Sequence, residues 1–318
     1  MGKDDETDDE TDTLLGSSFR GGIAGGFSLP AGWRPTHQSN GTVTLTDGSD
    51  IEVRVNTRRH RKGRLPKIFF KGKVQSALTW RPLSFEPYNI SWWVAWISFL
   101  AATGWLISSI LEFWDKDSDK VIDILDFVCA LIFVLSAYLQ LLEALNEEDV
   151  AFEDTFLVSN SDDLLGSSYP RQSAYRRDQN WKWFGFRWTR IGQYAANFDF
   201  FGAGLYAFGT FFALVTRESF LHFALVGLGK ISGSFLFVAA SIMLMVEVQD
   251  RWCVPQFDTI AWYASFFNFI GAFAFFIESI FDALERSDDN LGATFGFIGS
   301  IGFFICSCML IVEVANKH

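Results

Sequence analysis

The stretch GSFLFVAASIMLMVE at residues 233–247 returns as GSIGFFICSCMLIVE at residues 299–313. Both copies keep a Gly-Ser pair, one phenylalanine, a second serine and a closing Val-Glu at identical spacing. A weaker copy precedes them, with Cys129, Ala130, Phe133, Ala137 and Glu143 at the corresponding places. Small residues at these offsets let helices approach closely. The pattern predicts a repeated unit made of tightly packed helices.

These copies lie within six apolar runs, each close to the 20 or so residues that cross about 30 Å of hydrocarbon as a helix. Tryptophans near the ends of several runs, such as Trp92, Trp114 and Trp262, are typical of membrane interfaces. A hydrophobic content of 49% and an aromatic content of 17% also argue against a soluble chain. We expect spans at about residues 91–113, 123–145, 194–216, 220–246, 258–281 and 291–314. The fold class is therefore all-α membrane protein, with six transmembrane helices as three repeated helical hairpins.

The polar segments divide the chain further. We expect an N-terminal region (1–90), a first hairpin (91–146), a central loop (147–191), a second hairpin (192–248) and a third hairpin with a short tail (256–318). The N-terminal region begins with an acidic tail of disordered character. Alternating or clustered apolar residues at 42–46, 51–55 and 68–70 then predict a small β-hairpin or three-stranded meander.

The formal net charge of -11 conceals two basic clusters, one at residues 54–81 before the first span and one at residues 171–190 before the third. The connectors after spans one, three and five carry fewer basic residues. Because Lys and Arg gather on the cytosolic side, we expect both termini and the central loop in the cytosol. The clusters predict contact with anionic lipid headgroups rather than with nucleic acid.

Charged side chains inside the spans are costly in hydrocarbon and need a partner or water. Lys230 lies well inside the fourth span, while Glu112 and Glu278 lie near the exported ends of the first and fifth spans. Asp199 and Asn268 lie nearer the cytosolic half. We expect Lys230 to pair with Glu278 or Glu112, either as a structural bridge or as part of a path for ions or protons.

Three carboxylates, Glu143, Glu247 and Glu313, close the second helix of each hairpin at the cytosolic side. An acidic ring at this place could attract or gate cations. The alternative is that each glutamate marks the edge of the bilayer.

A short segment is duplicated in the cytosolic parts: DTLLGSSF at residues 12–19 returns as DDLLGSSY at residues 162–169. With Glu10 before Leu14 and Leu15, the first copy fits the acidic-dileucine pattern read by sorting adaptors; Leu164 and Leu165 repeat it. The pattern predicts an endolysosomal or vacuolar membrane, with the plasma membrane as the alternative.

Residues 115–126 place acids as an EF-hand loop does, but Lys120 stands where the sharp turn needs glycine. We interpret the segment as an acidic connector and expect no metal and no cofactor. The four histidines are scattered, so no catalytic residues and no enzymatic activity are predicted.

The hairpin unit, with its Gly-Ser-x-x-Phe stretch and terminal Val-Glu, resembles the YrhK-like membrane domain over about residues 91–314. That resemblance implies a two-span unit present in several copies and no particular activity. Two functions therefore stay open: a structural or partner-recruiting membrane component, or an ion or proton channel or transporter that uses Lys230, Glu112, Glu278 and Asp199.

Overall fold

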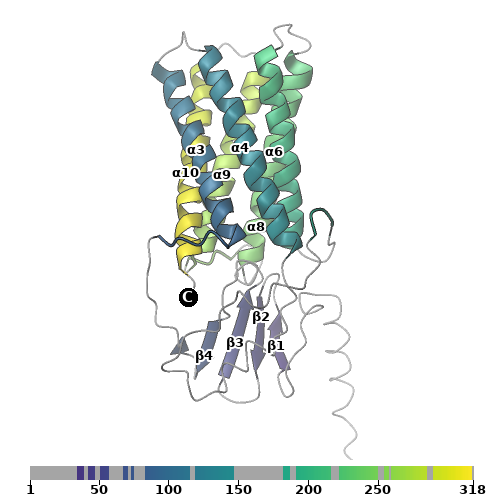
Figure 1. Cartoon of the computed structure of the whole chain (residues 1–318), viewed down its shortest axis with the longest axis vertical. Coiled ribbons are helices and arrows are strands. Elements are labelled where there is room, and N and C mark those ends of the chain that lie inside the picture. The colour runs from purple at the N-terminus through teal and green to yellow at the C-terminus, as the bar shows by residue number, and fades with distance from the viewer. Residues whose placement is uncertain are drawn as a thin grey trace, which may run out of the picture.

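The computed structural model describes residues 34–38, 42–46, 51–56, 67–70, 73–74, 83–114, 119–146, 182–186, 191–215, 222–249, 254–257, 259–284 and 289–316. Within them, six long helices stand side by side and a small sheet lies beyond one end (Figure 1).

The helices are α3 (Ile90–Trp114), α4 (Asp119–Leu145), α6 (Ile191–Val215), α8 (Leu228–Val248), α9 (Ile260–Ala283) and α10 (Asp289–Ala315). A single π-helical turn, η4 (His222–Gly227), leads directly into α8. At 1.5 Å per residue, each helix is long enough to cross the hydrocarbon of a bilayer. All six have the length and composition of membrane spans, so the fold is that of a multi-pass, all-α membrane bundle. The predicted spans are confirmed, with ends that differ by a few residues.

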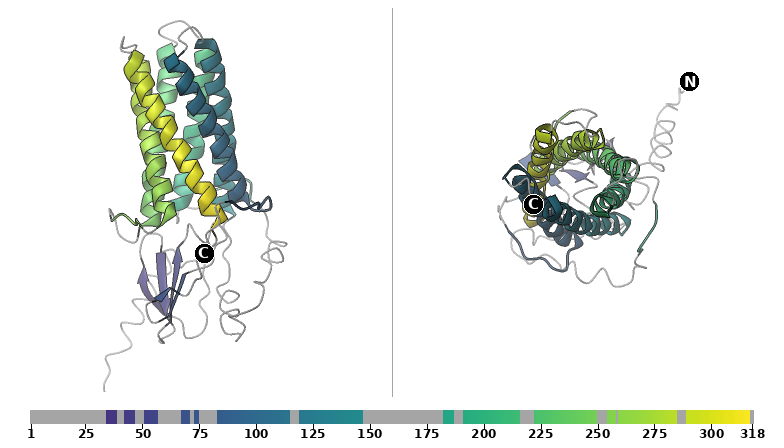
Figure 2. Two further views of the ribbon diagram at one scale, coloured as in Figure 1. Left: turned by 90° about the vertical axis from the view of Figure 1, so that its left-hand side faces the viewer. Right: turned by 90° about the horizontal axis from the view of Figure 1, so that it is seen from above.

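The six helices form a closed ring. Each packs against the helices before and after it in the chain, and α10 completes the ring by packing against α3. Seen from above, the helices surround a common axis (Figure 2). The most extensive contacts join α3 to α4, α6 to α8 and α9 to α10, so the predicted hairpins are the units of packing.

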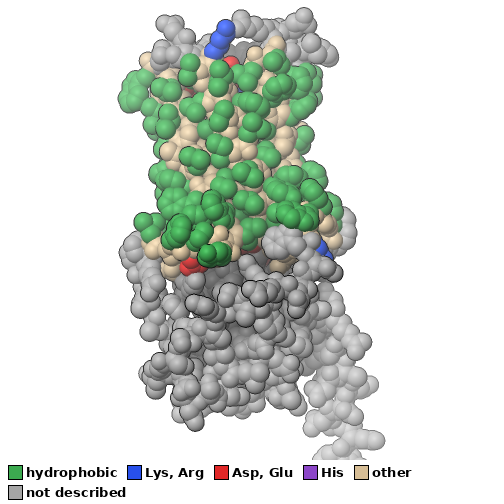
Figure 3. All heavy atoms as spheres, viewed as in Figure 1, with side chains coloured by type: hydrophobic (Ala, Val, Ile, Leu, Met, Phe, Trp, Pro, Cys, Tyr) green, Lys and Arg blue, Asp and Glu red, His purple; other side chains and the backbone are tan. Residues whose placement is uncertain are grey.

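Antiparallel packing gives the bundle two distinct ends. The end that contains the start of α3 and the end of α10 is called the C-terminal end. The opposite end, at which the two helices of each hairpin are joined, is called the connector end. Large apolar side chains cover the outer surface between these ends (Figure 3). Phe201 and Phe208 of α6 and Phe235 of α8 are among those that point outward. Such a surface suits contact with lipid rather than water.

Glycines set the close approach of the helices within a hairpin. A Cβ added at Gly233 would lie 2.7 Å from the Gly202 carbonyl oxygen, and one added at Gly302 would lie 2.7 Å from the Gly271 nitrogen. The two helices of the second and third hairpins therefore touch backbone to backbone, as small residues permit in membranes.

Five short strands form an antiparallel meander near the C-terminal end of the bundle (Figure 1). The strands are β1 (Arg34–Gln38), β2 (Thr42–Thr46), β3 (Ile51–Asn56), β4 (Lys67–Phe70) and β5 (Lys73–Val74), paired in that order. The three strands predicted from alternation are confirmed, and the structure adds one strand at each edge.

Candidate functional site

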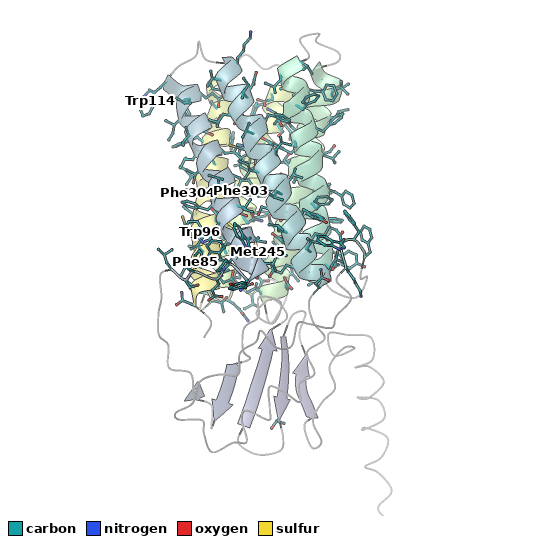
Figure 4. The ribbon with its side chains drawn as sticks, viewed as in Figure 1. Phe85, Trp96, Trp114, Met245, Phe303 and Phe304 are labelled. Atoms are coloured by element: carbon teal, nitrogen blue, oxygen red, sulfur yellow. The ribbon has the colours of Figure 1, made fainter. Side chains whose placement is uncertain are left out.

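An aromatic layer closes the axis of the bundle about half-way along its length. Every helix contributes one ring to it: Trp105, Phe133, Tyr206, Phe237, Phe275 and Phe303. Trp105 contacts four of the others, with ring centroids 5.3 Å from Phe133 and 5.6 Å from Phe275. The Phe275 and Phe303 rings are stacked at 5.3 Å, and Figure 4 shows Phe303 at this middle level.

A cavity whose wall is mostly apolar but includes several polar side chains, called the polar cavity below, lies between the aromatic layer and the C-terminal end. It is lined from all six helices and offers about 50 Å³ to the centres of water-sized molecules, enough for a few waters. Trp105, Phe133 and Phe303 bound it on the side of the aromatic layer. Two helical turns from the rings, each helix adds one lining residue: Ser98, Gln140, Asp199, Leu244, Asn268 and Leu310.

Hydrogen bonds connect the polar side chains around this cavity. Gln140 Nε2 donates to Asp199 Oδ2 at 3.2 Å, and Asn268 Nδ2 donates to Ser241 Oγ at 2.8 Å. The hydroxyls of Ser98 and Ser136 lie 2.6 Å apart. These bonds join α3 to α4, α4 to α6 and α8 to α9, so they link helices that are neighbours in the ring.

A charged cluster lies on the other side of the aromatic layer, toward the connector end. Lys230 Nζ of α8 lies 3.0 Å from Asp282 Oδ2 of α9. Asp126 of α4 lies near the Ser108 side chain of α3. Glu278, one turn before Asp282, has its Oε2 buried without a hydrogen-bond partner in the described part of the chain.

Glycines on the facing helices make room for these long side chains. A Cβ at Gly209 would lie 3.1 Å from Lys230 Cγ, and a Cβ at Gly296 would lie 3.1 Å from the Glu278 carboxyl carbon. Lys230 is thus on the second helix of the second hairpin, whereas Glu278 is on the first helix of the third hairpin.

The structure divides the charged residues predicted from sequence into two groups. Lys230 and Glu278 belong to the charged cluster, and Glu112 lies on the same face of α3 two turns beyond Trp105. Asp199 lies apart from them, across the aromatic layer. Lys230 forms its 3.0 Å ion pair with Asp282, one turn nearer the connector end than Glu278. The pairing of Lys230 with Glu278 or Glu112 stays a prediction.

The three terminal glutamates are buried inside the C-terminal end of the bundle. Glu143 is 5% exposed, and Glu247 and Glu313 are each 1% exposed. Ser91 Oγ donates to Glu143 Oε1 at 3.0 Å, and Glu143 alone of the three lines the cavity. Their burial places them inside the bundle rather than on its outer surface, and neither the acidic ring nor the bilayer-edge interpretation is decided by it.

Of the EF-hand-like pattern at residues 115–126, the structure describes residues 119–126, and all of these belong to α4, which begins at Asp119. The described residues also contain no group of three or more His, Cys, Asp or Glu arranged to hold a metal. The sorting segment with Glu10, Leu14, Leu15, Leu164 and Leu165 falls outside the residues that the structure describes.

Sequence reasoning missed half of the aromatic layer. Phe133, Phe237 and Phe303 belong to the repeated pattern, but Trp105, Tyr206 and Phe275 were not singled out. A common spacing could have revealed them: each lies seven residues after a polar residue of the cavity, namely Ser98, Asp199 and Asn268. That spacing places both residues on one helix face.

Comparisons with protein-family models, with curated proteins and with solved structures found no match for this chain. What the site can do chemically is therefore inferred from its geometry alone. An axis with a cavity bordered by carboxylates, an aromatic closure and an inner ion pair can hold and pass small charged species if the closure opens.

Proposed function

We propose that the bundle is a channel or transporter for cations or protons, closed at the aromatic layer. The observation that carries the proposal is the placement of the polar cavity and the charged cluster on one axis, on opposite sides of that layer. Ionisable residues at this depth are expensive, and in membrane proteins they line substrate paths or relay protons. A bundle that served only as an anchor would be more stable with apolar or small residues at these positions.

The three-hairpin arrangement supports the same proposal. Every helix contributes one ring to the aromatic layer and one lining residue to the cavity two turns away, so all six helices surround one axis. The matching positions of Phe133, Phe237 and Phe303 agree with an internal repeat of the kind found in many transporters. We also propose that the hairpins are related to the YrhK-like membrane domain. This resemblance assigns no enzymatic reaction to the protein.

We further infer that the C-terminal end of the bundle faces the cytosol, since the basic clusters at residues 54–81 and 171–190 precede in the sequence α3 and α6, which both begin at this end. Anionic lipids are the expected contacts of these clusters. The duplicated dileucine segments support an endolysosomal or vacuolar membrane and an interaction with sorting adaptors.

Purified protein in liposomes tests the transport proposal through cation and proton flux. Truncating Phe237 to Ala should increase flux because it removes one ring, 2% exposed, from the closure. Phe235→Ala is the matched control, since Phe235 lies on the same helix but is 57% exposed on the outer face. Absence of flux for the parent and for Phe237→Ala, both shown to be folded, would contradict transport.

A structural or partner-recruiting role is the second candidate. One observation favours it: the cavity ends at Trp105, Phe133 and Phe303 and does not reach Lys230. In that case Lys230 and Asp282 serve to hold two hairpins together, and the aromatic layer is a packed core. The flux assay separates the two candidates. If the protein is a scaffold, Phe237→Ala should lower its stability without increasing ion or proton flux.

A further inference from the structure

We propose that the polar cavity is a binding site for one small monovalent cation, with Asp199, Gln140 and Asn268 as its protein ligands. The proposal rests on the transport function inferred above and names what the axis would bind.

The charge around the cavity selects a cation. Two acidic residues, Asp199 and Glu143, line it, and none of the described lining residues is basic. Asp199 is 5% exposed, and its Oδ2 accepts a hydrogen bond from the neutral amide of Gln140. A carboxylate at this depth is stabilised by a nearby positive charge. An anion would meet only repulsion there, so a bound cation is the species that the cavity favours.

The neutral side chains supply oxygen atoms. Gln140 and Asn268 both direct their amide nitrogens to protein acceptors, which leaves their carbonyl oxygens to accept. The contact to Asn268 Oδ1 comes from the Cys306 thiol at 3.9 Å, a weak donor. Carboxylate, carbonyl and hydroxyl oxygens are the ligands of hard cations.

The size and charge of the site point to a monovalent ion. A cavity of about 50 Å³ holds a small cation with part of its water shell. Calcium sites combine several carboxylates, and magnesium demands strict octahedral geometry. Of the two carboxylates that line the cavity, Glu143 accepts a hydrogen bond from Ser91 Oγ. The proposed ligand set therefore combines the one carboxylate of Asp199 with two amides, which matches a single charge such as that of Na⁺ or K⁺.

Thermal unfolding in detergent tests the site directly. The parent protein is compared in NaCl, KCl and choline chloride at equal ionic strength and pH. A saturating cation that binds only the folded protein should raise the unfolding midpoint by about 2–4 °C over choline. Asp199→Asn should abolish this difference. Glu278→Gln, which removes a carboxylate across the aromatic layer, should keep it.

A second variant, Asn268→Ala, should reduce the difference and keeps the test decisive if Asp199→Asn does not fold. Equal midpoints of the parent in all three salts would overturn the proposal, as would a difference that survives in Asp199→Asn. A midpoint that depends on pH but not on the salt would overturn it in favour of a proton. Flux measured in parallel separates the two inferences. Cation binding without flux would support the binding site and contradict the transport function, whereas flux without cation binding would support transport and contradict the binding site.

Discussion

Lys230 of α8 forms an ion pair with Asp282 of α9, with 3.0 Å between Nζ and Oδ2, and so joins the second hairpin to the third inside the bundle. The lysine side chain is 15% exposed and the aspartate side chain 36% exposed. The pair is thus partly shielded rather than fully buried. We expect its contribution to stability to lie between that of surface ion pairs and that of fully buried ion pairs.

Replacing Lys230 with Met should destabilise the protein by about 2 kcal/mol, because Asp282 then loses its partner near the hydrocarbon. Adding Asp282→Asn should restore most of that loss, since it removes the charge left behind. Unfolding in detergent measures both. Lys230→Met with Glu278→Gln is the comparison variant, and a rescue by Glu278→Gln equal to that by Asp282→Asn would contradict a specific pair.

Replacing Gly233 with Ala should cost about 1–3 kcal/mol, because the added Cβ would lie 2.7 Å from the Gly202 carbonyl oxygen and force α6 and α8 apart. Gly204→Ala provides the control on α6, since nothing lies within 4 Å of a Cβ added there. Its stability should equal or exceed that of the parent. A similar loss of stability in both variants would show that the close contact between α6 and α8 does not determine the effect of Gly233→Ala.

A glycosylation reporter inserted after Asp117 should be modified, whereas one inserted after Asn160 should not. The first site lies in the connector between α3 and α4, and the second in the loop between α4 and α6, which belong to opposite ends of the bundle. From the basic residues we infer that the second end faces the cytosol. Modification after Asn160 alone would reverse the orientation and, with it, the side from which the cavity is entered.

Changing Leu14, Leu15, Leu164 and Leu165 together to Ala should move a fluorescent fusion from an endolysosomal or vacuolar membrane toward the cell surface. The reason is the loss of both copies of the dileucine segment. Basic residues in the same loops are left unchanged, so membrane orientation is preserved. An unaltered distribution would reduce the duplication to a similarity of loop composition.

The repeated pattern at residues 233–247 and 299–313 led directly to half of the candidate site. Its phenylalanines, Phe237 and Phe303, face the axis, and its serines Ser234, Ser241, Ser300 and Ser307 are all buried. The first helices of the hairpins carry a different aromatic in each copy, Trp105, Tyr206 and Phe275. Because these residues share size and shape rather than identity, a search for repeated letters passed over them.

The sequence by itself determined the six spans, their pairing into hairpins and three strands of the N-terminal sheet. These features depend on local properties, namely the length of an apolar run, the spacing of small residues and strand alternation. Only the tertiary structure decided that Lys230 pairs with Asp282, that Asp199 lies across an aromatic layer from it, and that a cavity separates that layer from Glu143. The ion pair arises from the packing of α8 against α9, and the cavity from the ring that α10 and α3 complete. No single helix determines which of its faces points to the axis, since apolar residues surround each helix and only a few polar residues, such as Asp199 and Lys230, mark the inner face.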